Sequence, residues 1–309
     1  MNTSGSASAP SVNEIRAAKY ISFVSTRKNG TPVATPVWVA PLDYLAPNVV
    51  GFTIDANAGK AKRLSHTNTV TVQPCDIRGR IVEGSPVVHG TAIVVLAALR
   101  NALKFVKKDL GSVKIVLSGV GAAGNAIARL LTLSGAKNII GFNHHGVIHN
   151  GMKSEDSMQQ WFIDNSNPNN FIGTMPEALV GADVFIGVSA PNILKEADIA
   201  TMAKGSIIFA LANPDPEVDP VLARKYATVV ATGRSDQPNQ INNVLAFPGI
   251  FRGLLDANAH KITDKLLVAA AEAIADCVSP EQLNASFIVP SVFDPNVTKA
   301  VAAAVKKSV

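Results

Sequence analysis

A glycine-rich turn in the middle of the chain constrains the fold more than any other feature of the sequence. The apolar run at 113–117 is typical of a buried strand, and it leads into Gly-Val-Gly-Ala-Ala-Gly at 119–124 and then a helical pattern. In that context Gly119 permits a tight turn, Gly121 lets the backbone approach a pyrophosphate, and Gly124 lets the helix pack closely on the strand. The motif predicts a dinucleotide site; the alternative is a strand–helix turn that binds nothing.

The helix that opens at this turn indicates where phosphates and a ribose would bind. Ala122 and Ala123 stand in its first turn, where free N–H groups and the helix dipole attract anions. At the end of the next strand an acidic residue usually meets the ribose hydroxyls, but here Asn143 occupies that place. An amide can bond a hydroxyl without repelling a 2′-phosphate, so the choice between NAD and NADP stays open. His144 and His145 could help to hold that phosphate, or could be exposed loop residues.

Beyond residue 90 the sequence alternates between strand and helix patterns. Short apolar runs predict buried strands at 113–117, 138–142, 184–188, 206–210 and 228–232. Helical spacing predicts helices at 91–110, 124–134, 263–277 and 296–307. Short buried strands that alternate with helices are typical of an α/β fold with a doubly wound parallel sheet. The glycine-rich turn after the first strand makes it a Rossmann-type sheet.

The chain has a different character before residue 90. Runs rich in β-forming residues predict strands at 20–26, 32–39, 49–54, 70–72 and 81–88. Asn29-Gly30 is a hairpin signal between the first two, and strands at this spacing favour a small antiparallel barrel or sandwich. We therefore expect a disordered tail at 1–12, an antiparallel segment at 13–90 and a nucleotide-binding domain at 91–309.

Composition excludes several classes of protein. Hydrophobic residues make up 47% and charged residues 17% of the chain, which suits a globular α/β protein. No apolar run of about 18 residues indicates a transmembrane helix, and no basic and aromatic interleaving indicates a nucleic-acid partner. The N-terminus lacks a signal-peptide pattern, and 2 cysteines are too few for a disulfide framework. We expect a cytoplasmic protein with a small-molecule partner and neither membrane nor nucleic-acid partners.

From residue 89 onward the sequence resembles the NAD(P)-binding domain of bacterial malic enzymes. The matching stretches are HGTAIVVLAALRNALKFV, IVLSGVGAAGNAIARLL, GADVFIGVSAP, FALANPDPE, VVATGRSDQPNQINNVLAFPGIFRG and IVPSVFDPNV. The resemblance implies NAD(P)-dependent oxidative decarboxylation of malate to pyruvate. It further implies that Ser189 and Asn213 contact the coenzyme and that Asn213 and Asn243 face the substrate. The alternative for both asparagines is turn chemistry.

The residues that malic enzymes use for catalysis are not recognisable here. The family uses a tyrosine, a lysine and a divalent metal, Mg²⁺ or Mn²⁺, which polarises the ketone as a Lewis acid. It carries these residues, an acidic pair and a further metal-binding aspartate upstream of its HGTA element. In this chain Ser85-Pro86-Val87-Val88 precedes His89, and the aspartate is absent. The other groups have no matching segment either, so we assign no catalytic or metal-binding residue.

The front segment, at 15–90, resembles a different family, the split-barrel flavoproteins of the pyridoxamine-phosphate-oxidase class and their F420-using branch. The matching stretches are AAKYISFVSTRKNGTPVATPVWVAP, GKAKRLSHTNTVTVQPCDIRGR and GSPVVHGTA. The resemblance implies a split barrel that binds F420 or FMN, with 35–38 at the ring and Lys60, Lys62 and Arg63 at a phosphate. That family continues for several strands after its GTA element, so we expect a truncated barrel fused to the malic-enzyme-like domain.

Three functions stay open on the sequence alone. The first is a malic-enzyme-type oxidoreductase acting on a substrate of the malate and pyruvate class. The second is a non-catalytic NAD(P)-binding module, and the third is an F420- or FMN-dependent split-barrel oxidoreductase. The missing base and the missing electrophile argue against malate turnover. Both families form dimers or larger assemblies, so the resemblances also imply a homo-oligomer if the chain folds.

Overall fold

The chain divides into two compact units. The computed structural model describes residues 90–155, 157–259 and 262–309 and, before them, the backbone of strands β1 to β5. The units comprise Met1–Val88 with Leu254–Ile262, and His89–Gly253 with Thr263–Val309. The second unit contains the glycine-rich turn.

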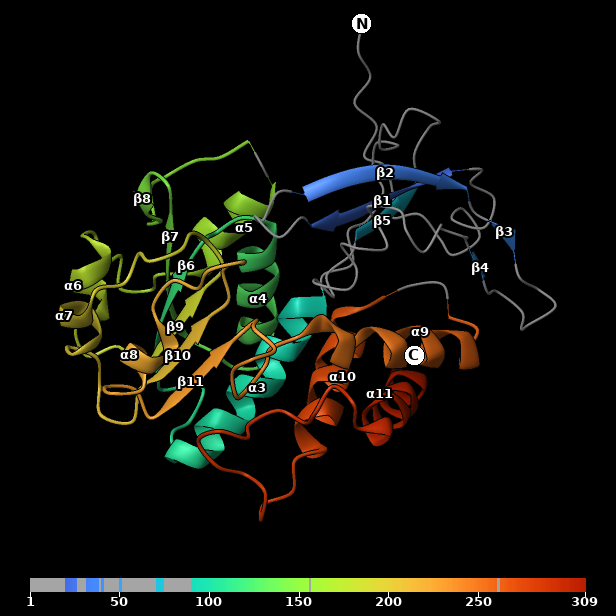
Figure 1. Ribbon diagram of the computed structural model, residues 1–309. Coiled ribbons are helices and arrows are strands. Elements are labelled where there is room, and N and C mark those ends of the chain that lie inside the picture. Colours follow the sequence, from blue (N-terminus) through green and yellow to red (C-terminus); the bar gives the residue numbers. More distant parts are fainter. Residues whose placement is uncertain are drawn as a thin grey trace, which may run out of the picture. The chain divides into compact units, whose positions relative to one another are not determined.

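The second unit is built on a six-stranded sheet in the order β11-β10-β9-β6-β7-β8 (Figure 1). Its strands are β6 (Lys114–Ser118), β7 (Asn138–Asn143), β8 (Gly146–Val147), β9 (Val184–Gly187), β10 (Ile207–Ala210) and β11 (Val229–Thr232). Neighbouring strands are parallel except β8, which turns back antiparallel on β7. β9, β10 and β11 are buried along their whole length, as expected where helices cover both faces of a sheet.

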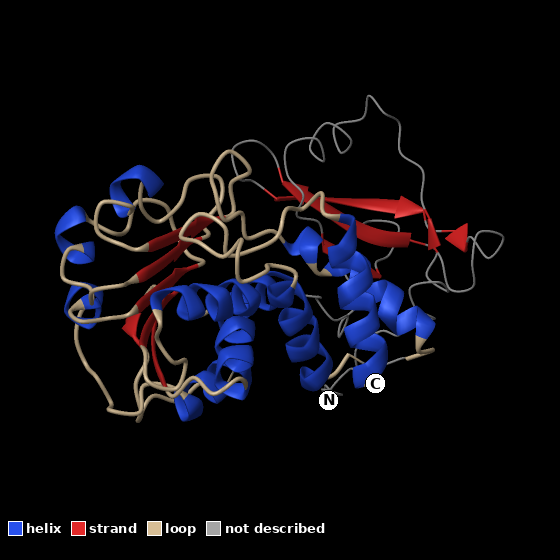
Figure 2. Ribbon diagram, turned by 90° about the horizontal axis from the view of Figure 1, so that it is seen from below, coloured by secondary structure: helices blue, strands red, loops and turns tan. Residues whose placement is uncertain are grey.

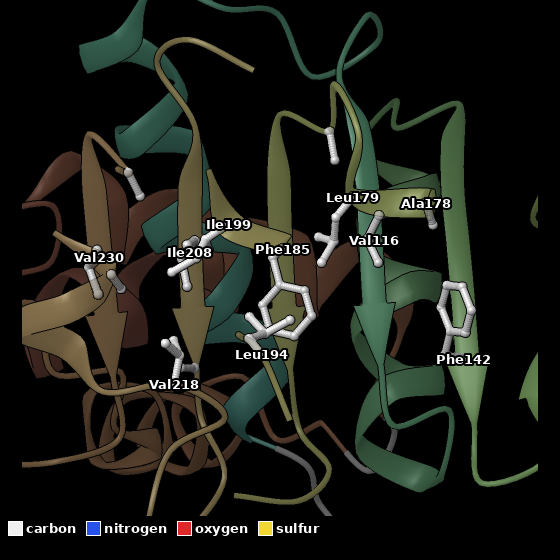
Figure 3. Close-up of a cluster of buried hydrophobic side chains, with 14 of the residues drawn as sticks. Val116, Phe142, Ala178, Leu179, Phe185, Leu194, Ile199, Ile208, Val218 and Val230 are labelled. Atoms are coloured by element: carbon white, nitrogen blue, oxygen red, sulfur yellow. The ribbon is translucent and has the colours of Figure 1, made fainter. Parts of the chain in front are cut away.

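Three short helices cover one face of the sheet. They are α6 (Met175–Leu179), α7 (Glu196–Ile199) and α8 (Pro220–Ala223). Phe185, Ile208 and Val230, from three adjacent strands, form one buried cluster with Leu179 and Ile199 of these helices (Figure 3). Burying an apolar side chain of this kind contributes about 1.5–3 kcal/mol. This cluster therefore holds the layer of short helices on the sheet.

Longer helices cover the opposite face, and both layers can be followed in Figures 1 and 2. They are α3 (Gly90–Val106), α4 (Ala122–Leu133), α5 (Ser157–Asn165) and α10 (Asp264–Asp276), and α11 (Pro295–Ser308) packs on α10. The chain between β11 and α10 forms η1 (Asn243–Leu245) and α9 (Phe247–Asp256). α3 is apolar on nearly all sides and is buried, and its Asn101 Nδ2 donates to Ala275 O at 2.9 Å and Ile288 O at 3.0 Å.

A group of hydrogen bonds links the starts of three central strands to the chain that follows α3. Asp183 immediately precedes β9, and its Oδ1 accepts from Lys108 Nζ at 2.6 Å. The other carboxylate oxygen accepts from the backbone N–H of Lys114 at 2.9 Å, at the start of β6. Lys108 Nζ also donates to Lys204 O at 2.7 Å, just before β10. These hydrogen bonds thus connect the starts of β6, β9 and β10 to the chain that follows α3.

The strands of the first unit are antiparallel. β1 (Tyr20–Thr26) pairs with β2 (Pro32–Trp38) and β5 (Thr71–Pro74), and β3 (Ala40–Pro41) pairs with β4 (Val50–Gly51). β1 has the predicted bounds, and β2 ends one residue before the prediction. Whether these strands belong to a split barrel stays a prediction. The predicted strand at 81–88 and the basic residues Lys60, Lys62 and Arg63 lie outside the described residues.

In the second unit the predicted helices and strands are present, with bounds that differ by a few residues. α3 shows the largest difference, since it ends at Val106 and not at residue 110. Lys107 adopts φ 58°, and Lys108 N donates back to Leu103 O at 3.0 Å, which closes the helix. Among the described residues, no helix combines the length and the apolar character needed to cross a bilayer.

Candidate functional site

A groove opens at the carboxyl end of β6, where the order of the sheet reverses. β6 leads to β7 on one side, whereas β9, on its other side, leads to β10. Doubly wound sheets bind ligands at such a switch point. The groove has a volume of about 440 Å³. Its walls are formed by Gly119, Val120, Gly121, Ala122, Ala123, Asn143, His144, Gln159 and Val188.

The three glycines of the turn have different geometric roles. Gly119 adopts φ +102°, and a Cβ there would lie 2.6 Å from Val188 O. At Gly124 a Cβ would clash with the carbonyl oxygen of Gly119, so only glycine lets α4 approach the strand this closely. A Cβ on Gly121 would meet no atom within 4 Å, so this position faces open space. The turn thus leaves room for a ligand at Gly121 and none at the other two positions.

The first turn of α4 presents backbone donors to this groove. Gly121 is the N-cap, with φ −104° and ψ −158°, and it provides no side-chain cap. Gly121 N donates to Gly119 O at 2.9 Å, and the first amide of the helical pattern that has an acceptor is that of Asn125, which donates to Gly121 O at 2.9 Å. The N–H groups of the preceding helical residues have no acceptor within an α-helix, and the helix dipole adds partial positive charge there. The arrangement can therefore hold an anion such as a pyrophosphate.

Asn143 lies at the end of β7 on the other wall of the groove. Its Oδ1 accepts from the backbone N–H of His145 at 2.8 Å, so the oxygen caps the turn that leads into β8. The rings of His144 and His145 lie 3.7 Å apart between centroids and are tilted by 46°. His144 lines the groove and both histidines are exposed. The groove therefore has an amide and an imidazole side chain at this end.

Ser189 follows β9 and is joined to the end of β6. Its Oγ lies 2.9 Å from Ser118 Oγ, in a hydrogen bond that either hydroxyl can donate. Val188, the residue before it, lines the groove, whereas Ser189 stands next to the groove wall. The serine pair thus connects the two strands between which the sheet order reverses.

The two asparagines predicted to face a substrate lie after neighbouring strands. Asn213 follows β10 and is exposed; its Nδ2 donates to Leu211 O at 3.3 Å, and its peptide bond to Pro214 is cis. Asn243 begins η1 beyond β11 and is buried, with Gly90 packed against its Cβ. Neither is part of the groove wall around α4. Their roles toward a coenzyme or substrate stay predictions.

Glu217 is a functional candidate that the sequence does not reveal. It is fully buried, and its carboxylate accepts from Ser189 N at 2.9 Å and from Ala212 N at 3.0 Å. Burial raises the pKa of this carboxyl above its usual value, and the backbone N–H donors partly offset that shift. Gln159, from α5, is a second groove residue without a sequence signal. Both positions arise from contacts between segments that are distant in the chain.

The described part of the chain offers no donor set of the kind that holds a metal ion. There, no three His, Cys, Asp or Glu side chains come together in a group that could hold a metal ion. Mg²⁺ and Mn²⁺ take oxygen ligands, and the resemblance implies an acidic pair and a further aspartate as the protein's share of them. The described residues therefore do not fit the divalent ion that the sequence resemblance implies, and the groove chemistry they provide is backbone amides, neutral amides and hydroxyls.

Comparison with known sequences finds the same type of protein repeatedly. The profile of a family described as "Malic enzyme, NAD binding domain" matches residues 88–309. The chain is 52% identical over 217 residues to an NAD-dependent malic enzyme of Geobacillus stearothermophilus, covering 70% of this chain and 45% of that protein. It is 47% identical over 222 residues to a bifunctional malic/malolactic enzyme of Bacillus subtilis, covering 71% of this chain and 54% of that protein.

Comparison with solved structures agrees. The crystal structure of an NAD-dependent malic enzyme from Thermotoga maritima aligns with a TM-score of 0.67 at 44% identity, over 72% of this chain and 58% of that one. The chain spans about half the length of the curated relatives it matches. The matched region contains every groove residue and both predicted asparagines.

Proposed function

Because the chain belongs to the malic enzyme family through its NAD-binding domain at 88–309, we propose that its groove binds NAD or NADP. The observation that carries this proposal is the glycine turn, which opens at Gly121 onto the uncapped start of α4. A pyrophosphate there accepts hydrogen bonds from the first-turn amides and benefits from the helix dipole. The turn thereby supplies both the space and the donors for the coenzyme.

The two halves of the coenzyme would extend to opposite sides of this turn. One ribose would meet Asn143 at the end of β7, whose neutral amide admits either NAD or NADP. The other half would reach toward the ends of β9 and β10, where Ser189 and Asn213 could donate to it. Asn213 and Asn243 carry amides that could also donate to a carboxylate of the malate and pyruvate class. The relatives include both NAD- and NADP-dependent malic enzymes.

The proposal assigns coenzyme binding to this chain and expects little turnover of malate. Oxidation of a hydroxyl needs a base for its proton, and decarboxylation of the product needs an electrophile. Among the described residues, no group is assigned as the base for the hydroxyl proton. They also contain no donor set for the metal that would serve as the electrophile in decarboxylation. Residues 15–88 do not carry the family's tyrosine, lysine or acidic pair in a recognisable motif.

Gly121→Ala tests the proposal directly. The backbone at Gly121 is extended and an added Cβ meets nothing, so the variant should fold, yet the methyl group stands where the pyrophosphate must approach. We expect the dissociation constant for NADH, titrated by fluorescence, to rise about tenfold or more, a loss of at least ~1.4 kcal/mol.

Gly124→Ala is the matched control. Here the methyl group clashes with Gly119 O, so we expect a loss of about 1–3 kcal/mol of stability in urea unfolding. Wild-type protein that binds neither NADH nor NADPH would contradict the proposed function. So would Gly121→Ala protein with unchanged affinity for both.

A further inference from the structure

We propose that Glu217 is a positioning residue that holds the loops after β9 and β10 in a single arrangement, so that Asn213 keeps a fixed position relative to the coenzyme groove. The inference deepens the proposed function and rests on it, because Asn213 matters only if a coenzyme or substrate binds there. Glu217 itself is fully buried and would touch neither.

The two oxygens of the Glu217 carboxylate serve different loops. Oε1 accepts from the backbone N–H of Ser189 at 2.9 Å, two residues after the end of β9. Oε2 accepts from the backbone N–H of Ala212 at 3.0 Å, two residues after the end of β10. Both N–H groups belong to loops at the carboxyl edge of the sheet. One buried side chain therefore bonds equivalent positions after two adjacent parallel strands.

The end of β9 leaves space for this carboxylate. Gly187 is the last residue of β9, and a Cβ there would collide with the Glu217 side chain. The backbone adds a further bond, from Leu194 N to Glu217 O at 3.0 Å. A buried carboxylate is costly unless its oxygens are hydrogen-bonded, and here each oxygen has a backbone donor. The side chain is thus held from several directions and has little freedom to change its two contacts.

Each of the two loops leads directly to a candidate site residue. Ser189 carries the hydroxyl that bonds Ser118 at the end of β6, beside the glycine turn. Ala212 is followed at once by Asn213. A continuous series of hydrogen bonds and chain neighbours therefore runs from the strand under the groove, through Ser189 and Glu217, to Asn213. Loss of the carboxylate would break this series at its middle.

Two substitutions separate the contributions of the two oxygens. Glu217→Leu keeps a similar volume but removes both acceptors, and Glu217→Gln keeps one acceptor and places an amide N–H₂ where the other was. Asn101→Leu is the matched control, because Asn101 is 1% exposed and also makes two buried bonds to backbone, between α3 and the segments at Ala275 and Ile288. It lies outside the groove wall.

The first measurement is amide hydrogen exchange at Ser189 and Ala212 in the coenzyme-free protein. We expect both amides to exchange slowly in the wild type, one of them to accelerate about tenfold in Glu217→Gln, and both to accelerate in Glu217→Leu. Asn101→Leu should leave the exchange of both amides unchanged relative to other amides of the sheet. If the Ser189 and Ala212 amides exchange in Glu217→Leu at the rates of the wild type, Glu217 does not hold the two loops. If the leucine variant does not fold, the same result in Glu217→Gln would overturn the proposal.

The second measurement is affinity for NADH. We expect the dissociation constant for NADH to rise about tenfold in Glu217→Leu and by a smaller factor in Glu217→Gln. Asn101→Leu should lower the melting temperature but leave the dissociation constant unchanged. Equal weakening by Asn101→Leu at the same loss of stability would reduce Glu217 to a general structural role. Wild-type protein that binds neither NADH nor NADPH would overturn the proposed function alone, since the exchange measurement tests the two hydrogen bonds of Glu217 without coenzyme.

Discussion

Two glycines three positions apart are needed at the groove for opposite reasons. Gly124 is required by what is already there, because the carbonyl of Gly119 occupies the space of a side chain. Gly121 faces space that nothing in the protein occupies, and under the proposed function this space admits the pyrophosphate. The spacing of a glycine motif indicates both positions equally, and only the surrounding atoms separate packing from ligand approach.

Glu217 provides a prediction for the dependence of stability on pH. Burial raises its folded-state pKa above the value in the unfolded chain. The stability contributed by the protonated carboxyl is therefore complete below the unfolded value and is lost as pH rises through the folded value. Glu217→Gln lacks this group, so the stability of the wild type relative to the variant should decrease as pH rises through that window. Urea unfolding of both proteins at several pH values measures the difference, and a pH-independent difference would contradict the prediction.

At the scale of elements, the sequence predicts the central strands well because each is an apolar run that ends at a turn signal. β10 and β11 begin one residue after their predicted starts and end where predicted. α7 and α8 are four residues long each, too short for a helical period, and neither was predicted. Glycine spacing identified the turn that lines one wall of the groove. The two hydrogen bonds from the Glu217 carboxylate to Ser189 N and Ala212 N could not be predicted, since they depend on how β9 and β10 align after folding.

The end of α3 supports a prediction at this scale. Lys107 stands in the left-handed region with φ 58°, a conformation that costs a residue with a Cβ more than it costs glycine. Lys107→Gly should therefore stabilise the protein by about 0.5–1 kcal/mol, because the helix termination of the native chain is kept and its strain is removed. Lys104→Gly, inside the same helix, should destabilise it by about 1 kcal/mol. Urea unfolding of the two variants measures both effects; equal effects would show that Lys107 is not strained.

At the scale of the whole molecule, the family match and the first unit have different consequences. Residues 88–309 carry the coenzyme domain of a malic enzyme, whereas the functional groups by which the family oxidises malate have no counterpart assigned in this chain. The proposed coenzyme binding can therefore be tested separately from malate turnover. The roles implied for the first unit, F420 or FMN binding in a split barrel, stay predictions.

Coenzyme binding and malate turnover should differ accordingly in solution. NADH or NADPH at about 100 times its dissociation constant should stabilise the protein by about 2.7 kcal/mol, seen as a rise of several degrees in melting temperature. Malate with NAD or NADP and Mg²⁺ or Mn²⁺ should yield little reduced coenzyme in an absorbance assay. A well-characterised malic enzyme serves as the positive control. Rapid turnover by the purified chain would show that catalytic groups are present where none was assigned.

The carboxylates at the two ends of β9 have a joint mechanical consequence. Asp183 anchors the strand before its first residue, and Glu217 anchors the chain just beyond its last. Hydrogen bonds at both ends of a strand oppose its sliding along its own axis relative to its neighbours. Under the proposed function, we therefore expect any adjustment to a bound coenzyme to occur in side chains and in the loops after the strands, while β9 keeps its position in the sheet.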